Sequence, residues 1–155
     1  MNVRCQFSCL MLVLLSVAQC TEGGSFQSFK RQHINDNKTD MDESECATVM
    51  MERKIKCNNK YKKINTFILC PAEEVRVVCH SPNLIEKRIY LNKTSSTYDS
   101  EEEFNIVVCK QQQTKPKLLY NGTKEIARIR ISCRDGLPVH FEKHLLGGAV
   151  EPPLP

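Results

Sequence analysis

The spacing of apolar and polar residues along the chain changes from helical to strand-like near its middle. In the first part, Phe26, Phe29 and His33 recur at intervals of three and four residues, with Lys30 outside that stripe. This spacing places the three side chains on one face of an α-helix. We therefore predict an amphipathic helix over residues 25–35 with its apolar face toward a core.

Two further helices are predicted from their start signals. Asp42 and Glu45 have the spacing of a capping box, and an apolar stripe beginning at Cys46 follows them. Residues 71–74 combine a proline with two acidic residues. That combination suits a first helical turn, because proline needs no amide partner there and acidic side chains are stabilised at the positive end of the helix dipole.

Short runs of β-branched and aromatic residues indicate strands in the rest of the chain. Ile129 and Ile131 alternate with Arg128 and Arg130, as in a strand with one buried face. Strands are predicted over residues 64–69, 88–91, 104–110, 118–120, 126–133 and 139–141, and residues 93–103 are interpreted as a polar loop. Helices early and an antiparallel sheet later predict an α+β fold.

The two ends of the chain differ from the domain between them. Arg4, an apolar run over residues 10–15 and small residues up to Ala18 and Cys20 are typical of a secretory signal peptide, and the run is too short to span a bilayer. We assign residues 1–20 to the signal peptide, with cleavage after Ala18 or after Cys20. Residues 21–146 are the domain, and residues 147–155 are expected to be a disordered tail. The protein is thus expected to be secreted and extracellular.

Secretion changes the interpretation of the cysteines. The chain has nine, of which six follow the assigned signal peptide: Cys46, Cys57, Cys70, Cys79, Cys109 and Cys133. An oxidising compartment predicts that these form disulfides, but their spacing does not select a pairing. Three sequons make Asn37, Asn92 and Asn121 candidate glycosylation sites.

The overall charge is only mildly positive, with 22 Lys and Arg residues against 18 Asp and Glu. The positive charges are concentrated in one short run, formed by Arg53, Lys54, Lys56, Lys60, Lys62 and Lys63. One interpretation is a phosphate-binding surface that also attracts anionic membranes. The other is a solvated helix end followed by a loop.

Histidines are the main candidates for chemistry. His33 lies on the predicted helical stripe and His140 in the last predicted strand, whereas loop or tail residues flank His80 and His144. A single histidine on an apolar stripe is more often a core residue than a catalyst. The sequence has no Cys-x-x-Cys pair, histidine cluster or glycine-rich phosphate loop, so we expect neither a metal site nor a cofactor.

Three segments together point to a family. They are FKRQH ending at His33, KKINTFI beginning at Lys62, and CRDGLPVHF containing His140. In this order, from about residue 26 to residue 142, the chain resembles the pancreatic-type ribonuclease (ribonuclease A) superfamily. The resemblance implies three helices packed on a twisted antiparallel sheet and stapled by disulfides. A short disulfide-closed loop after Cys79 is absent, so the chain resembles angiogenin-like, amphibian or fish members more than digestive enzymes.

The resemblance also implies a division of roles. His33 would be the general base, His140 the general acid and Lys62 the group that stabilises the transition state, while Gln32 would contact the phosphate. A histidine with a pKa near 6.5 suits both proton transfers, and a fixed ammonium suits the negative charge that develops on the phosphorus. The implied substrate is single-stranded RNA, because DNA lacks the 2′-hydroxyl that attacks the phosphorus.

The expected base specificity follows from the same resemblance. Asn65 and Thr66 match the family's pyrimidine pocket, in which a threonine hydroxyl pairs with the base edge as donor or acceptor. Phe141 would place its backbone amide near the phosphate. Cleavage is therefore expected after cytosine or uracil, through a 2′,3′-cyclic phosphate and without a cofactor.

The cysteines match the family only in part. Its third bridge, near the catalytic lysine, would involve the positions of Tyr61 and Leu118, which are not cysteines here. The resemblance implies the bridges Cys46–Cys109 and Cys79–Cys133. This leaves Cys57 and Cys70, and we predict that they pair with each other, with two free thiols or intermolecular pairing as the alternatives.

Glu142 stands where the family usually has an aspartate that orients the acid histidine. Two alternatives to an efficient enzyme therefore stay open on the same fold. One is a weakly catalytic, angiogenin-like signalling ligand, and the other is a cationic host-defence protein that acts on membranes. Besides single-stranded RNA, the candidate partners are a ribonuclease inhibitor, a cell-surface receptor and an anionic membrane, and the protein is expected to be a monomer.

Overall fold

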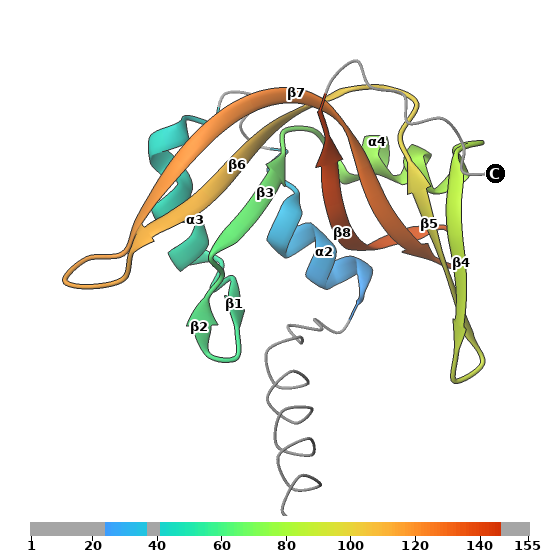
Figure 1. Cartoon of the computed structure of the whole chain (residues 1–155), viewed down its shortest axis with the longest axis horizontal. Helices are drawn as coiled ribbons and strands as arrows, with labels where there is room; N and C mark the ends of the chain where they lie inside the picture. The colour runs from blue at the N-terminus through green and yellow to red at the C-terminus, as the bar shows by residue number, and fades with distance from the viewer. Residues whose placement is uncertain (1–23, 37–40, 147–155) are drawn as a thin grey trace, which may run out of the picture.

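The structure is a computed structural model that describes residues 24–36 and 41–146. Three α-helices lie in the first half of this part of the chain, and an antiparallel sheet dominates the second half (Figure 1). The helices are α2 (Phe26–His33), α3 (Cys46–Glu52) and α4 (Ala72–Arg76), with short 3₁₀ turns at Glu43–Glu45 and Val77–His80. The strands are β1 (Lys56–Cys57), β2 (Lys60–Tyr61), β3 (Ile64–Ile68), β4 (Leu84–Tyr90), β5 (Lys93–Asp99), β6 (Phe104–Gln113), β7 (Leu119–Arg134) and β8 (Leu137–Leu145).

The predicted helices are confirmed, and their ends follow the sequence signals. The hydroxyl of Ser25 accepts a hydrogen bond from the amide of Ser28 at 3.0 Å and caps α2. Asp42 and Glu45 form the expected capping box, although it caps the 3₁₀ turn that leads into α3. Pro71 is the N-cap of α4, and acidic residues fill the first turn of that helix. The α+β fold predicted from the sequence is therefore present.

The long strand β7 connects two parts of the sheet, which we call its arms: β3 and β6 form one arm, and β4, β5 and β8 form the other. The strand order is β3-β6-β7-β5-β4, and β8 also pairs with β7. The first half of β7 pairs with β6, and its second half pairs with β5 and β8. Figure 1 shows β7 curving across the width of the molecule, with α2 beneath it. The two strands predicted at residues 118–120 and 126–133 are thus parts of a single strand.

The interpretation of residues 93–103 as a loop is wrong for its first part, because Lys93–Asp99 form β5. This strand pairs with β4 on one side and with β7 on the other. Its threonines and serines give no apolar alternation, but its backbone groups are satisfied by two neighbouring strands. Pairing with distant segments therefore determines this strand, whereas the local sequence suggests a loop.

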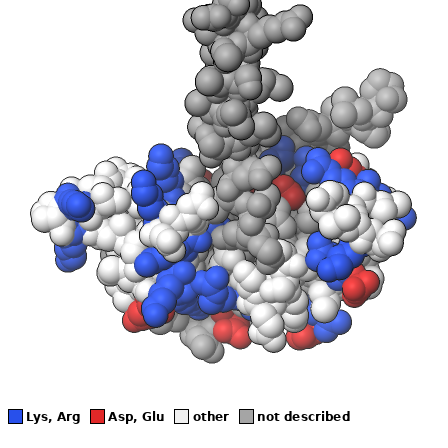
Figure 2. Space-filling view, turned by 90° about the horizontal axis from the view of Figure 1, so that it is seen from below, with Lys and Arg blue, Asp and Glu red and all other residues white. Residues whose placement is uncertain are grey.

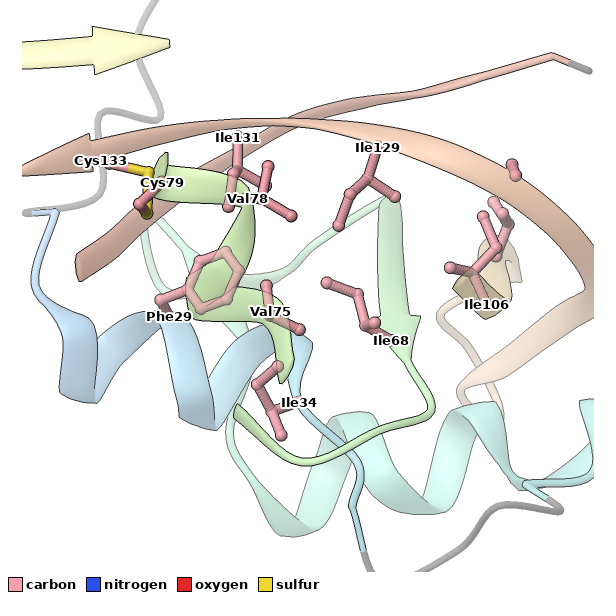
Figure 3. Packing of buried hydrophobic residues seen from close by; sticks show 12 residues of the cluster. Phe29, Ile34, Ile68, Val75, Val78, Cys79, Ile106, Ile129, Ile131 and Cys133 are labelled. Carbon is pink, nitrogen blue, oxygen red and sulfur yellow. A yellow bond between two sulfur atoms is a disulfide. The ribbon is translucent and has the colours of Figure 1, made fainter. Parts of the chain in front are cut away.

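The core consists of two clusters, one under each arm of the sheet. The first lies between α2, α4 and the central strands, where Figure 3 shows side chains converging from these elements; it includes Phe29, Ile68, Val75, Ile106, Ile129 and Ile131. The second packs α3 against β3 and β6 and includes Met41, Met50, Ile55, Phe67 and Val107. Burial on both sides of β3 fixes this strand, which leads directly out of the segment with the candidate lysine.

Two of the three expected disulfides are confirmed, and each fastens a helical segment to the sheet. The Cα atoms are 5.7 Å apart in Cys46–Cys109 and 5.8 Å apart in Cys79–Cys133. The predicted Cys57–Cys70 bridge is wrong. Cys70 is a free thiol and Cys57 is disulfide-bonded, so the two are not joined to each other.

The length of β3 explains this result. Cys57 lies in the hairpin before β3 and Cys70 lies just after it. The five residues of this strand span about 16 Å. A disulfide needs Cα atoms within about 7 Å of each other. The two cysteines are near in sequence but at opposite ends of a strand.

The predicted signal peptide, the C-terminal tail and Asn37 lie outside the described residues. Asn92, at the tip of the β4–β5 hairpin, and Asn121, in β7, are both exposed. Within the described ranges, no helix has the length and apolarity needed to cross a membrane.

Candidate active site

The last turn of α2 carries a buried histidine with a fixed ring. The Nδ1 atom of His33 lies 2.9 Å from the carbonyl oxygen of Thr66. A carbonyl oxygen can only accept, so Nδ1 carries the hydrogen and Nε2 keeps its lone pair. The rings of Phe29 and Phe141 lie 5.3 and 5.2 Å from the His33 ring, measured between centroids. The contact with Thr66 thus fixes the orientation of the His33 ring and involves only Nδ1, so that Nε2 is the basic nitrogen.

The surroundings of His33 favour its neutral form. Burial lowers the pKa of this ring from 6.5 to about 3; the Thr66 carbonyl opposes the shift, and the charges of Lys62 and His140 add to it. The ring is therefore neutral near pH 7, which is the state a proton acceptor needs. The contribution of His140 to this shift means that the two histidines, far apart in sequence, are close in the fold.

Lys62 reaches from the segment after β2 to the helix that carries His33. Its ammonium donates a hydrogen bond to Oε1 of Gln32 at 2.7 Å. The Gln32 amide nitrogen donates to the hydroxyl of Ser28 at 2.7 Å, which fixes the orientation of the amide. Asn65 donates to the backbone carbonyl of Gln32 at 2.8 Å. Side chains from three segments thus form one network next to His33.

The backbone of Lys62 and of the following residue is held by hydrogen bonds as well. The Tyr120 hydroxyl donates to the carbonyl oxygen of Lys62, and the Lys62 amide donates to Ile55 at 3.2 Å. The amide of Gln111 donates to the carbonyl of Lys63 at 2.7 Å. Contacts from β6 and β7 and from the segment before β1 therefore restrict the position of this lysine.

Thr66 is the residue predicted to recognise the base. It is buried in β3 and stands directly opposite Val108 of β6. Directly opposed residues have Cβ atoms about 5 Å apart. Because valine has no hydrogen-bonding group, this neighbour leaves the Thr66 hydroxyl able to donate or to accept.

His140 has a more open position than His33. It lies in β8 opposite Ser132 of β7, and its side chain is 45% exposed. Its Nε2 atom is 3.7 Å from Oε2 of Glu142. The next residue, Phe141, packs against the first core cluster and the His33 ring. The strand β8 therefore contributes an exposed histidine and a partly buried phenylalanine to the site.

The basic run divides into a structural and an exposed part. The Arg53 guanidinium donates to the carbonyl oxygens of Arg31 and Ile34, and Arg31 donates back to Arg53 and Lys54, so this pair fastens α2 to the end of α3. Burial lowers the pKa of Arg53. Figure 2 shows Lys and Arg side chains gathered on the lower face of the molecule. The exposed lysines of the run are Lys54, Lys56, Lys60 and Lys63.

Comparisons with known proteins agree with this geometry. The model of the pancreatic ribonuclease family matches residues 24–142. The chain belongs to the pancreatic ribonuclease family. It is 33% identical over 120 residues to the pancreatic ribonuclease of Iguana iguana, covering 76% of this chain and 95% of that protein. It is 24% identical over 139 residues to the angiogenin of Gallus gallus, covering 88% of this chain and 92% of that protein. The crystal structure of green turtle egg white ribonuclease is similar with a TM-score of 0.60 and 28% identity, covering 77% of this chain and 98% of that chain.

Several residues of the candidate site were missed by sequence reasoning. Tyr120, Ser28 and Ser132 touch Lys62, Gln32 and Glu142, respectively, but no local motif marks them. Tyr120 and Ser132 meet their partners only once strands are paired, whereas Ser28 lies one helical turn before Gln32 in α2. The predicted residues that the structure brings together directly or through one neighbour are Gln32, His33, Lys62, Asn65, Thr66, His140 and Phe141.

The two weaker histidine candidates lie apart from this network. His144 pairs with Glu125 at 3.0 Å, and His80 lies beside Gly136. Among the residues that the structure describes, no group of three or more His, Cys, Asp or Glu side chains is placed to hold a metal ion.

Proposed function

We propose that this chain is a secreted endoribonuclease that cleaves single-stranded RNA after pyrimidines, by transphosphorylation through a 2′,3′-cyclic phosphate. The observation that carries the proposal is the His33 ring, which is held by Thr66 with Nε2 as its basic atom and lies beside the Lys62–Gln32 network. A merely structural histidine has no need of an adjacent ammonium. Membership of the pancreatic ribonuclease family supports the same reaction.

In the proposed reaction, His33 removes the proton of the ribose 2′-hydroxyl. The 2′-oxygen then attacks the adjacent phosphorus, while the bond from phosphorus to the 5′-oxygen breaks. His140 gives a proton to that leaving oxygen. The additional negative charge of the transition state lies near the Lys62 ammonium and the Phe141 backbone amide, and Gln32 contacts the phosphate. Each proton transfer contributes about 10²- to 10⁴-fold to the rate.

The pyrimidine preference rests on Thr66. Its hydroxyl can accept from the N3–H of uracil or donate to the N3 of cytosine. The neighbouring Asn65 is held by the Gln32 carbonyl, which fixes the strand on which Thr66 lies. Both pyrimidines should therefore be accepted.

The decisive assay uses mature protein folded under oxidising conditions and a His140→Ala variant prepared identically. Both receive uridylyl-adenosine and its 2′-deoxy analogue, and the 2′,3′-cyclic phosphate is measured. Cleavage by the wild type alone, and of the ribose substrate alone, is the expected result. Equal background in the two proteins would contradict the proposal, because it would come from a contaminating nuclease.

A second candidate function is that of a weakly catalytic signalling or host-defence protein on the same fold. The observation that favours it is the tip of the β4–β5 hairpin, where Ile89, Tyr90 and Leu91 are 77%, 75% and 78% exposed. Cell stimulation or membrane disruption that the His140→Ala variant retains would support this function. Loss of both effects in that variant would leave RNA cleavage as the cause.

Secretion, a monomeric state and glycosylation at Asn92 and Asn121 are part of the proposal. The exposure of both asparagines supports it. Intact-mass measurement of the secreted protein before and after enzymatic removal of N-glycans tests the modification, and the N-terminal residue found in the same experiment tests the cleavage site after Ala18 or Cys20.

A further inference from the structure

A row of three side chains crosses the sheet beside the candidate acid histidine. In the strand register, Thr97 of β5 stands opposite Ser132 of β7, and Ser132 stands opposite His140 of β8. Side chains opposed in this way lie on the same face of a sheet, whereas the neighbours Ile131 and Cys133 point into the core. Ser132 is nevertheless only 7% exposed. A buried hydroxyl thus lies beside a histidine whose side chain is nearly half exposed.

The hydrogen bonds of this row have one consistent direction. The Ser132 hydroxyl donates to Oε1 of Glu142 at 2.7 Å, because an ionised carboxylate only accepts. The hydroxyls of Thr97 and Ser132 are 2.8 Å apart. Since Ser132 has a single proton and gives it to Glu142, Thr97 is the donor of this second bond. The other carboxylate oxygen of Glu142 then lies 3.7 Å from Nε2 of His140.

We propose that Ser132, supported by Thr97, is a positioning residue for the general acid His140 and acts through Glu142. The Glu142 side chain is 37% exposed and has one more rotatable bond than an aspartate, so it needs a second contact to hold one geometry. Ser132 supplies that contact to one oxygen and directs the other oxygen toward Nε2. The imidazolium then turns its Nδ1–H to the leaving group.

This inference rests on the proposed ribonuclease function and concerns one step of it. The Nδ1–H bond of His140 breaks as the proton moves to the 5′-oxygen, and the bond from phosphorus to that oxygen breaks with its electron pair remaining on the oxygen. Correct aim of the ring matters only when the leaving oxygen needs this proton. A substrate whose leaving group is stable as an anion bypasses the requirement.

The test compares two uridine 3′-phosphodiesters. One is uridylyl-adenosine, whose leaving group is the 5′-alkoxide of adenosine. The other is the 4-nitrophenyl ester, whose leaving group is the stabilised 4-nitrophenolate. For Ser132→Ala, kcat on the dinucleotide should fall about 3- to 10-fold, as expected for the net loss of one hydrogen bond, with little change in KM. On the nitrophenyl ester the variant should match the wild type.

A matched control is Ser100→Ala, which removes another buried serine hydroxyl next to the same sheet. That hydroxyl accepts from the amide of Ile129 and donates to the carbonyl of Glu102, away from His140. It should lower stability without any dependence on the leaving group. Thr97→Val keeps Ser132 but removes the hydroxyl that donates to it. This variant should show the same dependence on the leaving group as Ser132→Ala, with a smaller loss of kcat, and it replaces Ser132→Ala in the test if that variant does not fold.

A double-mutant cycle with Glu142→Gln completes the test. If Ser132 acts through Glu142, replacing it in the Glu142→Gln background should change kcat on the dinucleotide by less than twofold. Equal losses of Ser132→Ala on both substrates, or full additivity with Glu142→Gln, would overturn the inference and leave the proposed function intact. A wild-type protein that cleaves neither substrate would instead refute the proposed function itself.

Discussion

Removing the Tyr120 hydroxyl should reduce catalysis more than stability. This hydroxyl donates to the backbone carbonyl of Lys62, the residue whose ammonium bonds to Gln32. In this chain, Tyr61 and Leu118 occupy the positions of a family disulfide that would otherwise fasten the lysine segment. We therefore expect Tyr120→Phe to loosen Lys62 while the surrounding sheet remains folded.

The magnitude follows from the remaining contacts. The net loss of one hydrogen bond costs about 1 kcal/mol, which lowers the melting temperature by roughly 3–6 °C for a domain of this size. The amides of Lys62 and Gln111 still donate to Ile55 and Lys63, so the strand pairing persists. A shift of the ammonium by a fraction of an ångström to 1 Å lowers kcat/KM by about 10- to 100-fold.

The assay measures kcat/KM on uridylyl-adenosine together with the urea midpoint. Tyr98→Phe is the matched control, because it removes the same atom from a half-buried tyrosine in the other arm of the sheet. That control should retain wild-type activity. A Tyr120→Phe protein with the expected stability loss but wild-type kcat/KM would refute the reasoning, since Lys62 would then be positioned by its other contacts alone.

Three further outcomes are expected. Burial lowers the pKa of His33 to about 3, so the folded protein keeps this ring neutral, whereas the unfolded chain protonates it near pH 6.5. The stability of the protein should therefore fall as the pH decreases from about 6.5 toward 3. The urea midpoint of a His33→Asn variant should depend less on pH in that range. Val108→Asp places a hydrogen-bond acceptor opposite Thr66, so the threonine hydroxyl donates to it and can only accept from the base. Cleavage should therefore shift from cytosine toward uracil. The control Val108→Leu should leave the ratio of cleavage after the two bases unchanged. Burial, with Glu74 as a further cause, raises the pKa of the Cys70 thiol to about 12, so iodoacetamide should label Cys70 slowly at pH 8 in the folded protein and rapidly in urea, and rapid labelling in both states would show that the site is open.

The sequence predicted the parts of the molecule that local patterns determine. The helical stripe around His33, the capping box at Asp42 and the alternation along Ile129 and Ile131 all reflect the spacing of a single element, and each appears in the structure. The fold and the two disulfides followed from the family resemblance.

Other parts could not be predicted, because they depend on pairing between distant segments. The strand β5 has polar residues and becomes a strand through its neighbours β4 and β7. Cys57 and Cys70 were predicted to pair because they remained after the two family bridges, and the extended strand between them separates them. The roles of Tyr120 and Ser132 depend on cross-strand contacts that leave no local signal.

The two histidines of the site are held by different physical means, and this difference determines what their neighbours do. His33 is buried, so a backbone carbonyl and packed rings fix both its orientation and its protonation. The His140 side chain is nearly half exposed, so we infer that its aim depends on polar contacts through Glu142 rather than on burial. Substitutions around His33 should therefore reduce stability and activity together, because the same packing provides both. Substitutions in the Thr97–Ser132–Glu142 row should reduce activity on poor leaving groups by more than their cost in stability accounts for, because the polar contacts of that row orient a side chain that contributes little to the core.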